Sequence, residues 1–270
     1  MNYHYKLVIY NMKKHLLYSL LILAFIGQSC AQKPGNASPV VEPKVFLKNF
    51  MSYWKYSTQQ LIFTDDFNCY AVTGEPISKS SFLAKYASGD YIPVRLQTKG
   101  GKAAYRLYKV SGSNVNADIL QTIKQSGSFA YNEYLQLGKP LTGFNFTDLN
   151  GKVYTTAMLK GKIVALKFWF INCHACNNEM PELNKVVEQY KNRKDILFLS
   201  LATDSPKELK VFLKKTKFNY AVISEQNDYM TKQFKTNVYP THVLIDKKGI
   251  VQLVTSDSKI LTEKLKKEAI

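Results

Sequence analysis

The chain has 270 residues, too many for one small domain and enough for two domains behind a targeting segment. Hydrophobic residues make up 46% and charged residues 21% of it, which excludes a disordered or low-complexity protein. The net charge of +17 comes from lysines and arginines spread along helix-like segments, without the interleaved aromatic residues typical of RNA-binding modules. We therefore expect solvated basic faces and no nucleic-acid partner; attraction to an acidic partner or an anionic membrane surface is the alternative.

Residues 1–30 have the pattern of an export signal. A basic stretch at 12–15 precedes an apolar run at 16–26, which is too short to predict a transmembrane helix. Residues 1–11 add little to this pattern, so Met12 is an alternative to Met1 as the start of translation. We expect the protein to be exported to the cell envelope, on the periplasmic side of the membrane.

Cys30 follows small residues directly after the apolar run, an arrangement that resembles the lipobox of bacterial lipoproteins, although Gly27 and Gln28 depart from the usual pattern. The resemblance implies a lipidated Cys30 that anchors the protein to a membrane. The alternatives are ordinary signal-peptidase cleavage nearby and an uncleaved anchor. Residues 31–44 contain proline, glycine and serine and are expected to be a flexible tether.

We predict a small α+β domain of unknown function over residues 45–137. Strands are expected at 91–97 and 103–110, with a hairpin turn at Gly100-Gly101 between them, and helices are expected at 78–87 and 117–134. Cys69 is the only cysteine in this region. A lone cysteine is most often a small buried side chain, so we assign it no role.

From Lys139 onward strands alternate with helices, which predicts a βαβ-containing sheet. Asn150-Gly151 is a hairpin signal, and Asp204-Ser205-Pro206 is a typical helix start. Strands are expected at 144–149, 153–155, 163–170, 196–202, 220–223, 241–246 and 250–254. Helices are expected at 176–190, 206–215, 228–234 and 258–267.

Cys173 and Cys176 are separated by two residues at the junction of an apolar strand and a helix, which is the arrangement that dithiol exchange requires. The N-terminus of a helix favours a thiolate, so Cys173 is the expected nucleophile and Cys176 the expected resolving thiol. Zinc is the competing interpretation, but it needs two further ligands, and His242 is the only later histidine or cysteine. We therefore expect no metal and no cofactor.

His174 lies between the two cysteines. A protonated imidazole there would lower the thiol pKa and make the pair more oxidising, whereas a solvent-exposed side chain would have little effect. Both alternatives stay open from the sequence.

Three motifs carry a resemblance to a known family. They are FWFINCHACNNEMPEL at 168–183, VYPT at 238–241 and the segment 144–152. Together they resemble the TlpA/ResA branch of the thioredoxin superfamily, over about residues 139–270. The resemblance implies an α/β thioredoxin fold, a mixed central sheet flanked by helices, preceded by the small α+β domain. It also implies a thiol-disulfide oxidoreductase.

The resemblance assigns roles to further residues. Pro240 is implied to be a cis-proline that faces the cysteines and turns the backbone of Tyr239 towards a substrate strand. Pro181 should kink the helix. Glu179 matches a glutamate linked to proton handling in ResA-like proteins; an exposed helix residue without a role is the alternative.

Three positions depart from relatives. Lys167 stands where thioredoxin has a buried aspartate. As a cation behind Cys176 it would favour thiolates; alternatively its stem packs and its amine reaches outward to solvent. Asn172 replaces a tryptophan and Ala175 a proline that tends to favour the reducing enzyme. The direction of electron flow therefore stays open.

We carry three functional hypotheses. The first is an exported disulfide reductase that acts on protein thiols and disulfides and takes electrons from a membrane donor. The second is a thiol peroxidase of the peroxiredoxin-related class, although these enzymes have threonine or serine three residues before the reactive cysteine, where this chain has Phe170. The third is a binding protein supported by a redox-active thioredoxin domain.

Overall fold

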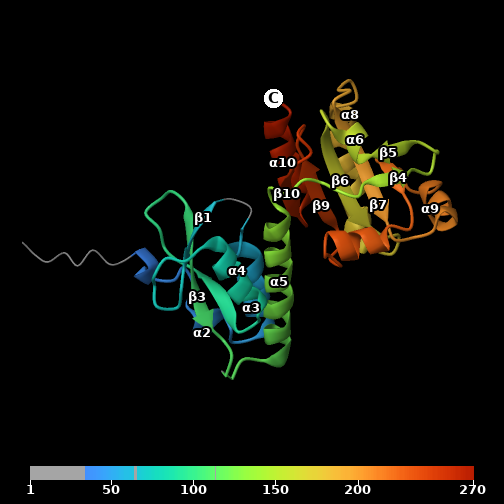
Figure 1. Cartoon of the computed structure of the whole chain (residues 1–270). Helices are drawn as coiled ribbons and strands as arrows, with labels where there is room; N and C mark the ends of the chain where they lie inside the picture. Colours follow the sequence, from blue (N-terminus) through green and yellow to red (C-terminus); the bar gives the residue numbers. More distant parts are fainter. Residues whose placement is uncertain (1–33, 64–65, 113) are drawn as a thin grey trace, which may run out of the picture.

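The computed structural model describes residues 34–63, 66–112 and 114–270. The predicted export signal and Cys30 lie outside the described residues. Within them, the elements form two units with separate hydrophobic cores, which lie side by side in Figure 1. No helix in this part of the chain is both long and apolar enough to cross a membrane.

The N-terminal unit contains a three-stranded sheet in the order β1-β3-β2, packed against helices. β1 is parallel to β3, and β2 is antiparallel to it. The elements are η1 (Pro34–Asn36), α2 (Pro43–Phe46), α3 (Phe50–Gln60), β1 (Phe67–Tyr70), α4 (Lys79–Ala87), β2 (Tyr91–Arg95), β3 (Ala103–Lys109) and α5 (Ala117–Gln136).

The two helices and the hairpin that the sequence predicts for this unit are present. Ser78 and Asn116 cap α4 and α5 through side-chain oxygens that accept backbone N–H bonds. Gly100 and Gly101 in the β2–β3 connection have φ values of 88° and 79°, a conformation that favours glycine.

The sequence patterns did not predict η1, α2, α3 or β1. The described part of the expected tether, residues 34–44, is bonded to the sheet, since the N–H of Val40 donates to the carbonyl of Arg95 at 2.8 Å. The aromatic and hydroxyl residues of α3 have only modest helix propensity, so its packing in the core decides its structure.

The C-terminal unit contains a mixed sheet in the order β10-β9-β6-β7-β8, with helices on both faces. β6, β7 and β8 are parallel; β9 is antiparallel to β6 and β10 to β9. This is a thioredoxin fold, as predicted. Its elements are β4 (Asn145–Thr147), β5 (Val153–Thr155), α6 (Thr156–Leu159), β6 (Ile163–Trp169), α7 (His174–Asn178), α8 (Met180–Gln189), β7 (Ile196–Ala202), α9 (Pro206–Leu213), β8 (Ala221–Ile223), η2 (Tyr229–Gln233), β9 (Thr241–Ile245), β10 (Val251–Thr255) and α10 (Ser258–Glu268).

Two predicted helices differ in detail from the structure. The helix predicted at 176–190 starts earlier, at His174, and is broken into α7 and α8 at Glu179. Pro181 lies two residues after the break, in the first turn of α8, where a backbone N–H would have no partner within the helix and proline is therefore tolerated. The helix predicted at 228–234 is a short π-helix, η2.

α5 joins the two units. It lies against β10, and the N–H of Gly138, just beyond its end, donates to the carbonyl of Val251 at 2.9 Å. Along its length Asn132 Nδ2 donates to the carbonyl of Lys235 at 3.2 Å and Gln136 Nε2 to that of Phe234 at 3.3 Å. The N-terminal unit is thereby held next to the loop that follows η2.

Gly127 determines how closely α4 and α5 approach, and its replacement by alanine should destabilise the protein. A methyl group there would clash with the carbonyl of Tyr86 and lie 2.9 Å from the backbone nitrogen of Ala87. We expect Gly127→Ala to lower the free energy of unfolding by roughly 1–3 kcal/mol, measured by urea denaturation. Gln121→Ala, at an exposed position of the same helix, should change it little. Equal stability of Gly127→Ala and the wild type would show that the helices are not in tight contact.

Candidate active site

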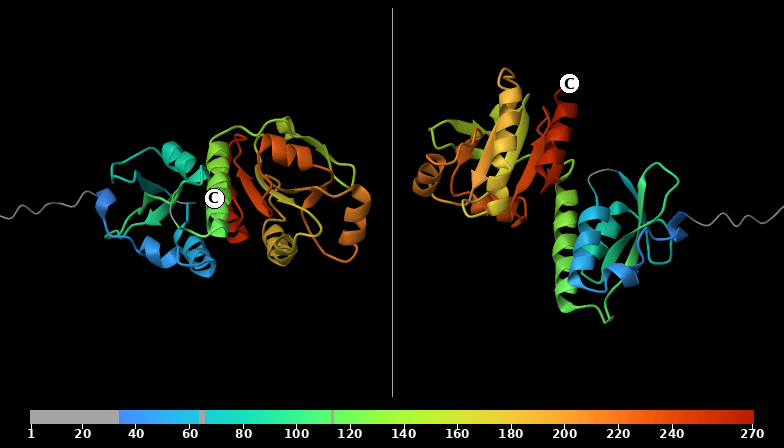
Figure 2. Two further views of the ribbon diagram at one scale, coloured as in Figure 1. Left: turned by 90° about the horizontal axis from the view of Figure 1, so that it is seen from below. Right: turned by 180° about the vertical axis from the view of Figure 1, so that it is seen from behind.

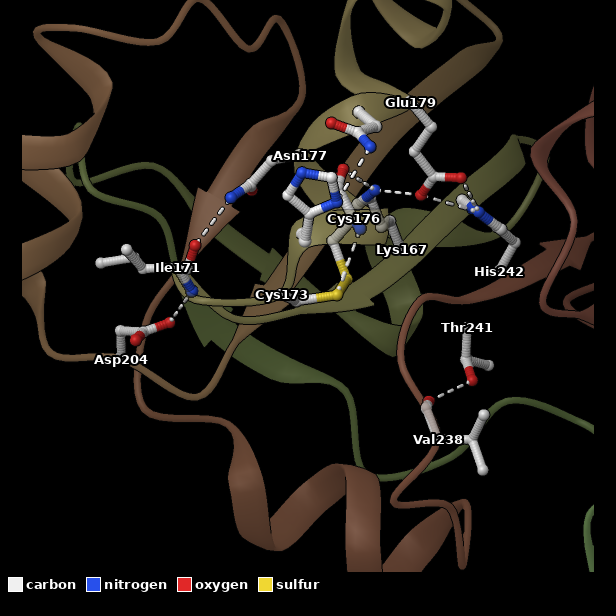
Figure 3. Close-up of a disulfide and its surroundings, with 12 residues drawn as sticks. Lys167, Ile171, Cys173, Cys176, Asn177, Glu179, Asp204, Val238, Thr241 and His242 are labelled. Carbon is white, nitrogen blue, oxygen red and sulfur yellow. Dashed lines mark hydrogen bonds and ion pairs between the residues drawn. A yellow bond between two sulfur atoms is a disulfide. The ribbon is translucent and has the colours of Figure 1, made fainter. Parts of the chain in front are cut away.

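Cys173 and Cys176 form a disulfide at the end of the central strand β6 (Figure 3). Cys173 is the N-cap of α7, and its sulfur accepts the N–H of Cys176 at 3.1 Å. Cys173 is 6% exposed and Cys176 is fully buried. Cys173 is thus the sulfur closer to solvent, and a backbone donor is already in place for its thiolate.

The loop before Cys173 is held by side chains from two other segments. Asp204, after β7, accepts the N–H of Ile171 at 2.9 Å. Asn177 Nδ2, on α7, donates to the carbonyl of Ile171 at 2.7 Å. These bonds hold both backbone polar groups of Ile171, directly before the exposed Asn172, and so position the chain that enters Cys173.

The peptide bond between Tyr239 and Pro240 is cis. Thr241 Oγ1 donates to the carbonyl of Val238 at 2.7 Å, which closes the loop around it (Figure 3). The Tyr239 ring packs edge-on against Phe170 at a centroid distance of 5.4 Å, and it contacts the buried cluster that contains both cysteines. In the described part of the chain, neither backbone polar group of Tyr239 is hydrogen-bonded.

A chain of three buried polar side chains lies behind Cys176. Lys167 Nζ donates to the carbonyl of Cys176 at 3.0 Å and forms an ion pair with Glu179. His242 Nε2 lies 3.1 and 3.2 Å from the two carboxylate oxygens of Glu179. Because His242 Nδ1 is buried without a partner among the described residues, the geometry favours the tautomer in which Nε2 donates to Glu179.

The surroundings shift the pKa of both charged groups. Burial lowers the pKa of the Lys167 amine, and the neighbouring Glu179 opposes that shift. Burial alone would raise the pKa of Glu179, but the hydrogen bonds and charges of His242 and Lys167 outweigh it, so the pKa lies below its usual value. Glu179 is therefore held as a carboxylate.

The sequence left two alternatives for Lys167, and one of them is wrong. Its amine does not reach solvent, because the side chain is fully buried and bonded on the inside of the fold. Glu179 is likewise not an exposed helix residue, since only 13% of its side chain is accessible. From the sequence, His242 was expected to matter only as a possible metal ligand. The usable signal in the sequence was its position two residues after Pro240; its place opposite Lys167 follows from the register of β9 and β6 in the structure.

His174 and Ala175 are exposed on α7, away from the buried chain. His174 Nδ1 lies 3.1 Å from Asn178 Nδ2 on the same helix.

Cys69 lies in β1 of the other unit, and burial raises the pKa of its thiol to about 11. In the described residues, no group of three or more histidine, cysteine or acidic side chains is arranged to hold a metal ion.

A thioredoxin fold with a Cys-x-x-Cys disulfide at a helix N-terminus defines the class of thioredoxin-like dithiol proteins. The sequence model of the AhpC/TSA family matches residues 137–254. ResA from Bacillus cereus, a thiol-disulfide oxidoreductase, is 34% identical over 143 residues, which are 53% of this chain and 79% of ResA. The thioredoxin-like protein YneN from Bacillus subtilis is 25% identical over 136 residues, 48% of this chain and 79% of YneN.

Among solved structures, the thioredoxin domain of a Bacteroides vulgatus thiol-disulfide oxidoreductase is 23% identical, with a TM-score of 0.44, and the match covers 48% of this chain and 96% of that domain. A thiol-disulfide oxidoreductase from Bacteroides fragilis is 20% identical, with the same TM-score, over 48% of this chain and 98% of its own. The similarity to ResA settles the family. The chain belongs to the ResA-like thiol-disulfide oxidoreductases, and it is an enzyme of that class.

Removal of the Glu179 charge should destabilise the fold, because Lys167 would be left buried without its counter-ion. We expect Glu179→Gln to lower the free energy of unfolding of the oxidised protein by about 3 kcal/mol. The double variant Lys167→Met, Glu179→Gln should recover part of that loss, since it removes both charges. Urea denaturation measures both values. A double variant less stable than Glu179→Gln would contradict the pairing.

The contribution of Glu179 should also depend on pH. Its pKa is lower in the folded than in the unfolded protein, so its stabilising effect is present above the unfolded pKa and is lost as the pH falls through the folded pKa. The stability difference between the wild type and Glu179→Gln should therefore be constant at neutral pH and shrink below about pH 4.3. A difference that grows on acidification would contradict this assignment.

Proposed function

We propose that this enzyme is an exported reductase of disulfides in protein substrates. The observation that carries the proposal is the position of Cys173, which caps α7 and belongs to the same cluster as the cis-proline loop. The ResA relatives are named thiol-disulfide oxidoreductases, which agrees with this chemistry.

In the proposed reaction the reduced enzyme supplies two electrons. The Cys173 thiolate attacks one sulfur of a substrate disulfide, forms a mixed disulfide and releases the first substrate thiolate. Cys176 then loses its proton and attacks the Cys173 sulfur, which forms the enzyme disulfide and releases the second substrate thiolate. Protons from solvent and from Cys176 neutralise the products, and a dithiol on a membrane donor reduces the enzyme again.

Pro240 and Tyr239 are proposed to hold the substrate. An extended substrate segment can pair with the free backbone groups of Tyr239, which places its cysteine against Cys173. The ring contact between Tyr239 and Phe170 keeps this loop close to the cysteine loop. The cis-proline loop is thus proposed as one wall of the substrate site.

Glu179 is proposed to handle the proton of Cys176. Lys167 links it to that cysteine, because its amine bonds both the carbonyl of Cys176 and the Glu179 carboxylate. Lys167 and His174 are proposed to tune the potential of the pair. Lys167 acts from the buried side, and His174 acts from the exposed surface of α7.

Insulin reduction by the full chain tests the reaction. Cys173→Ala should reduce the rate to below roughly 1% of wild type, because it removes the attacking thiolate. Cys176→Ser should stop after the first step and accumulate a mixed disulfide with insulin. Cys69→Ala should leave the rate unchanged, because its thiol has a high pKa and is buried. Full insulin reduction by Cys173→Ala would contradict the proposal and favour a binding role for the protein.

A thiol peroxidase is the second candidate, favoured by the match to the AhpC/TSA family. Peroxide reduction needs only the first cysteine to form a sulfenic acid, with any thiol to resolve it. Peroxide turnover that survives Cys176→Ser and is lost in Cys173→Ala would support this candidate. The buried Cys176 bonded to Cys173 in the structure favours disulfide exchange instead.

The cell envelope is the proposed location, with a lipid anchor at Cys30. Residues 12–30 support it through their basic, apolar and small-residue pattern. Expression in a bacterial host with labelled palmitate should label the wild type and leave Cys30→Ala unlabelled, with Cys69→Ala as the matched control. Equal labelling of wild type and Cys30→Ala would contradict the anchor.

A further inference from the structure

A hollow of about 590 Å³ lies where the N-terminal unit meets the cis-proline loop. One wall is α5, which contributes Gln125 and Phe129, and the other is the loop after η2, with Asn237 and Val238. In Figure 1, the C-terminal end of α5 lies beside the C-terminal unit, and the rest of the helix extends past it. Figure 2 shows the same arrangement from behind.

The hollow is positively charged. Lys124 on α5 and Lys235 on the loop line it from opposite sides, and both side chains are exposed. None of the described residues that line it carries a carboxylate; its other polar groups are amides and hydroxyls. The loop wall is fixed, because Asn132 donates to the carbonyl of Lys235. Two cations without a lining counter-ion complement an anionic ligand.

The hollow continues the proposed substrate path. Val238 lines it and immediately precedes the cis peptide, and Figure 3 shows this loop next to the disulfide. A segment that pairs with Tyr239 and stays extended advances by about 3.3 Å per residue. Lys235 and Tyr239 are four positions apart, so a segment that follows the loop from Tyr239 past Val238 comes within reach of Lys235 a few residues from its reacting cysteine.

We propose that this hollow, defined by Lys124, Gln125, Phe129, Lys235 and Val238, docks an acidic segment of the substrate protein next to its reacting disulfide. The inference rests on the proposed reductase function and gives the N-terminal unit a role in it. α5 supplies one side of the binding site, the amides offer hydrogen bonds to an extended backbone, and Phe129 and Val238 provide a small apolar surface.

The test compares two synthetic peptides, each closed by one intramolecular disulfide and flanked by either three aspartates or three lysines. The reduced full chain should reduce the aspartate-flanked peptide roughly five-fold faster at low salt, and high salt should remove the preference. In the double variant Lys124→Glu, Lys235→Glu the preference should reverse, so that the lysine-flanked peptide is reduced faster. The control variant Lys99→Glu, Lys109→Glu has the same charge change at exposed positions outside the hollow, and it should keep the wild-type preference.

A steric variant and a small substrate complete the test. Gln125→Trp should fill the hollow and slow the reaction of both peptides. Hydroxyethyl disulfide is neutral and too small to reach the hollow, so every variant should reduce it at the wild-type rate. If the control variant also reverses the preference, or Lys124→Glu, Lys235→Glu keeps it, the docking proposal is wrong. If the wild type reduces none of the three disulfides, the proposed function itself is wrong.

Discussion

The ion pair between Lys167 and Glu179 constrains the architecture around the cysteines. Lys167 comes from the middle of the central strand, where every other side chain is apolar and buried. A charge at that depth requires a partner, because the desolvation of an unpaired ion costs several kcal/mol. Glu179 provides the partner from the break between α7 and α8, and His242 holds Glu179 from β9. The position of the active-site helix is therefore tied to the sheet through the Glu179 carboxylate and through the bond from Lys167 to the carbonyl of Cys176.

The ion pair between Lys167 and Glu179 also affects how strongly the cysteine thiolates are stabilised. An uncompensated cation behind Cys176 would stabilise thiolates and so make the disulfide more oxidising. Because Glu179 is paired with Lys167, it limits how far the buried amine can stabilise the thiolates, and Cys173 also receives a hydrogen bond from the backbone at the start of α7. This charge balance supports the proposed reductase direction, and α5 lies beside the cis-proline loop that we propose as the substrate site.

Much of this fold could be predicted from local patterns. The continuous apolar run of β6, the hairpin glycines and the proline after Ser205 each mark their element with little dependence on the rest of the chain. The helix α3 could not be predicted, since its aromatic residues become helical only through packing in the core. The partnership of Lys167 with His242 also escaped prediction, because it depends on the register of two strands far apart in the sequence.

The reduction potential of the Cys173–Cys176 pair, measured by equilibration with glutathione in the wild type and in Glu179→Gln, tests this account most directly. We predict a wild-type value near that of thioredoxin, about −270 mV. Loss of the carboxylate should shift it to a less negative value, since Lys167 would then act on the thiolates unopposed. A wild-type potential near about −120 mV, or a Glu179→Gln variant with an unchanged potential, would contradict it.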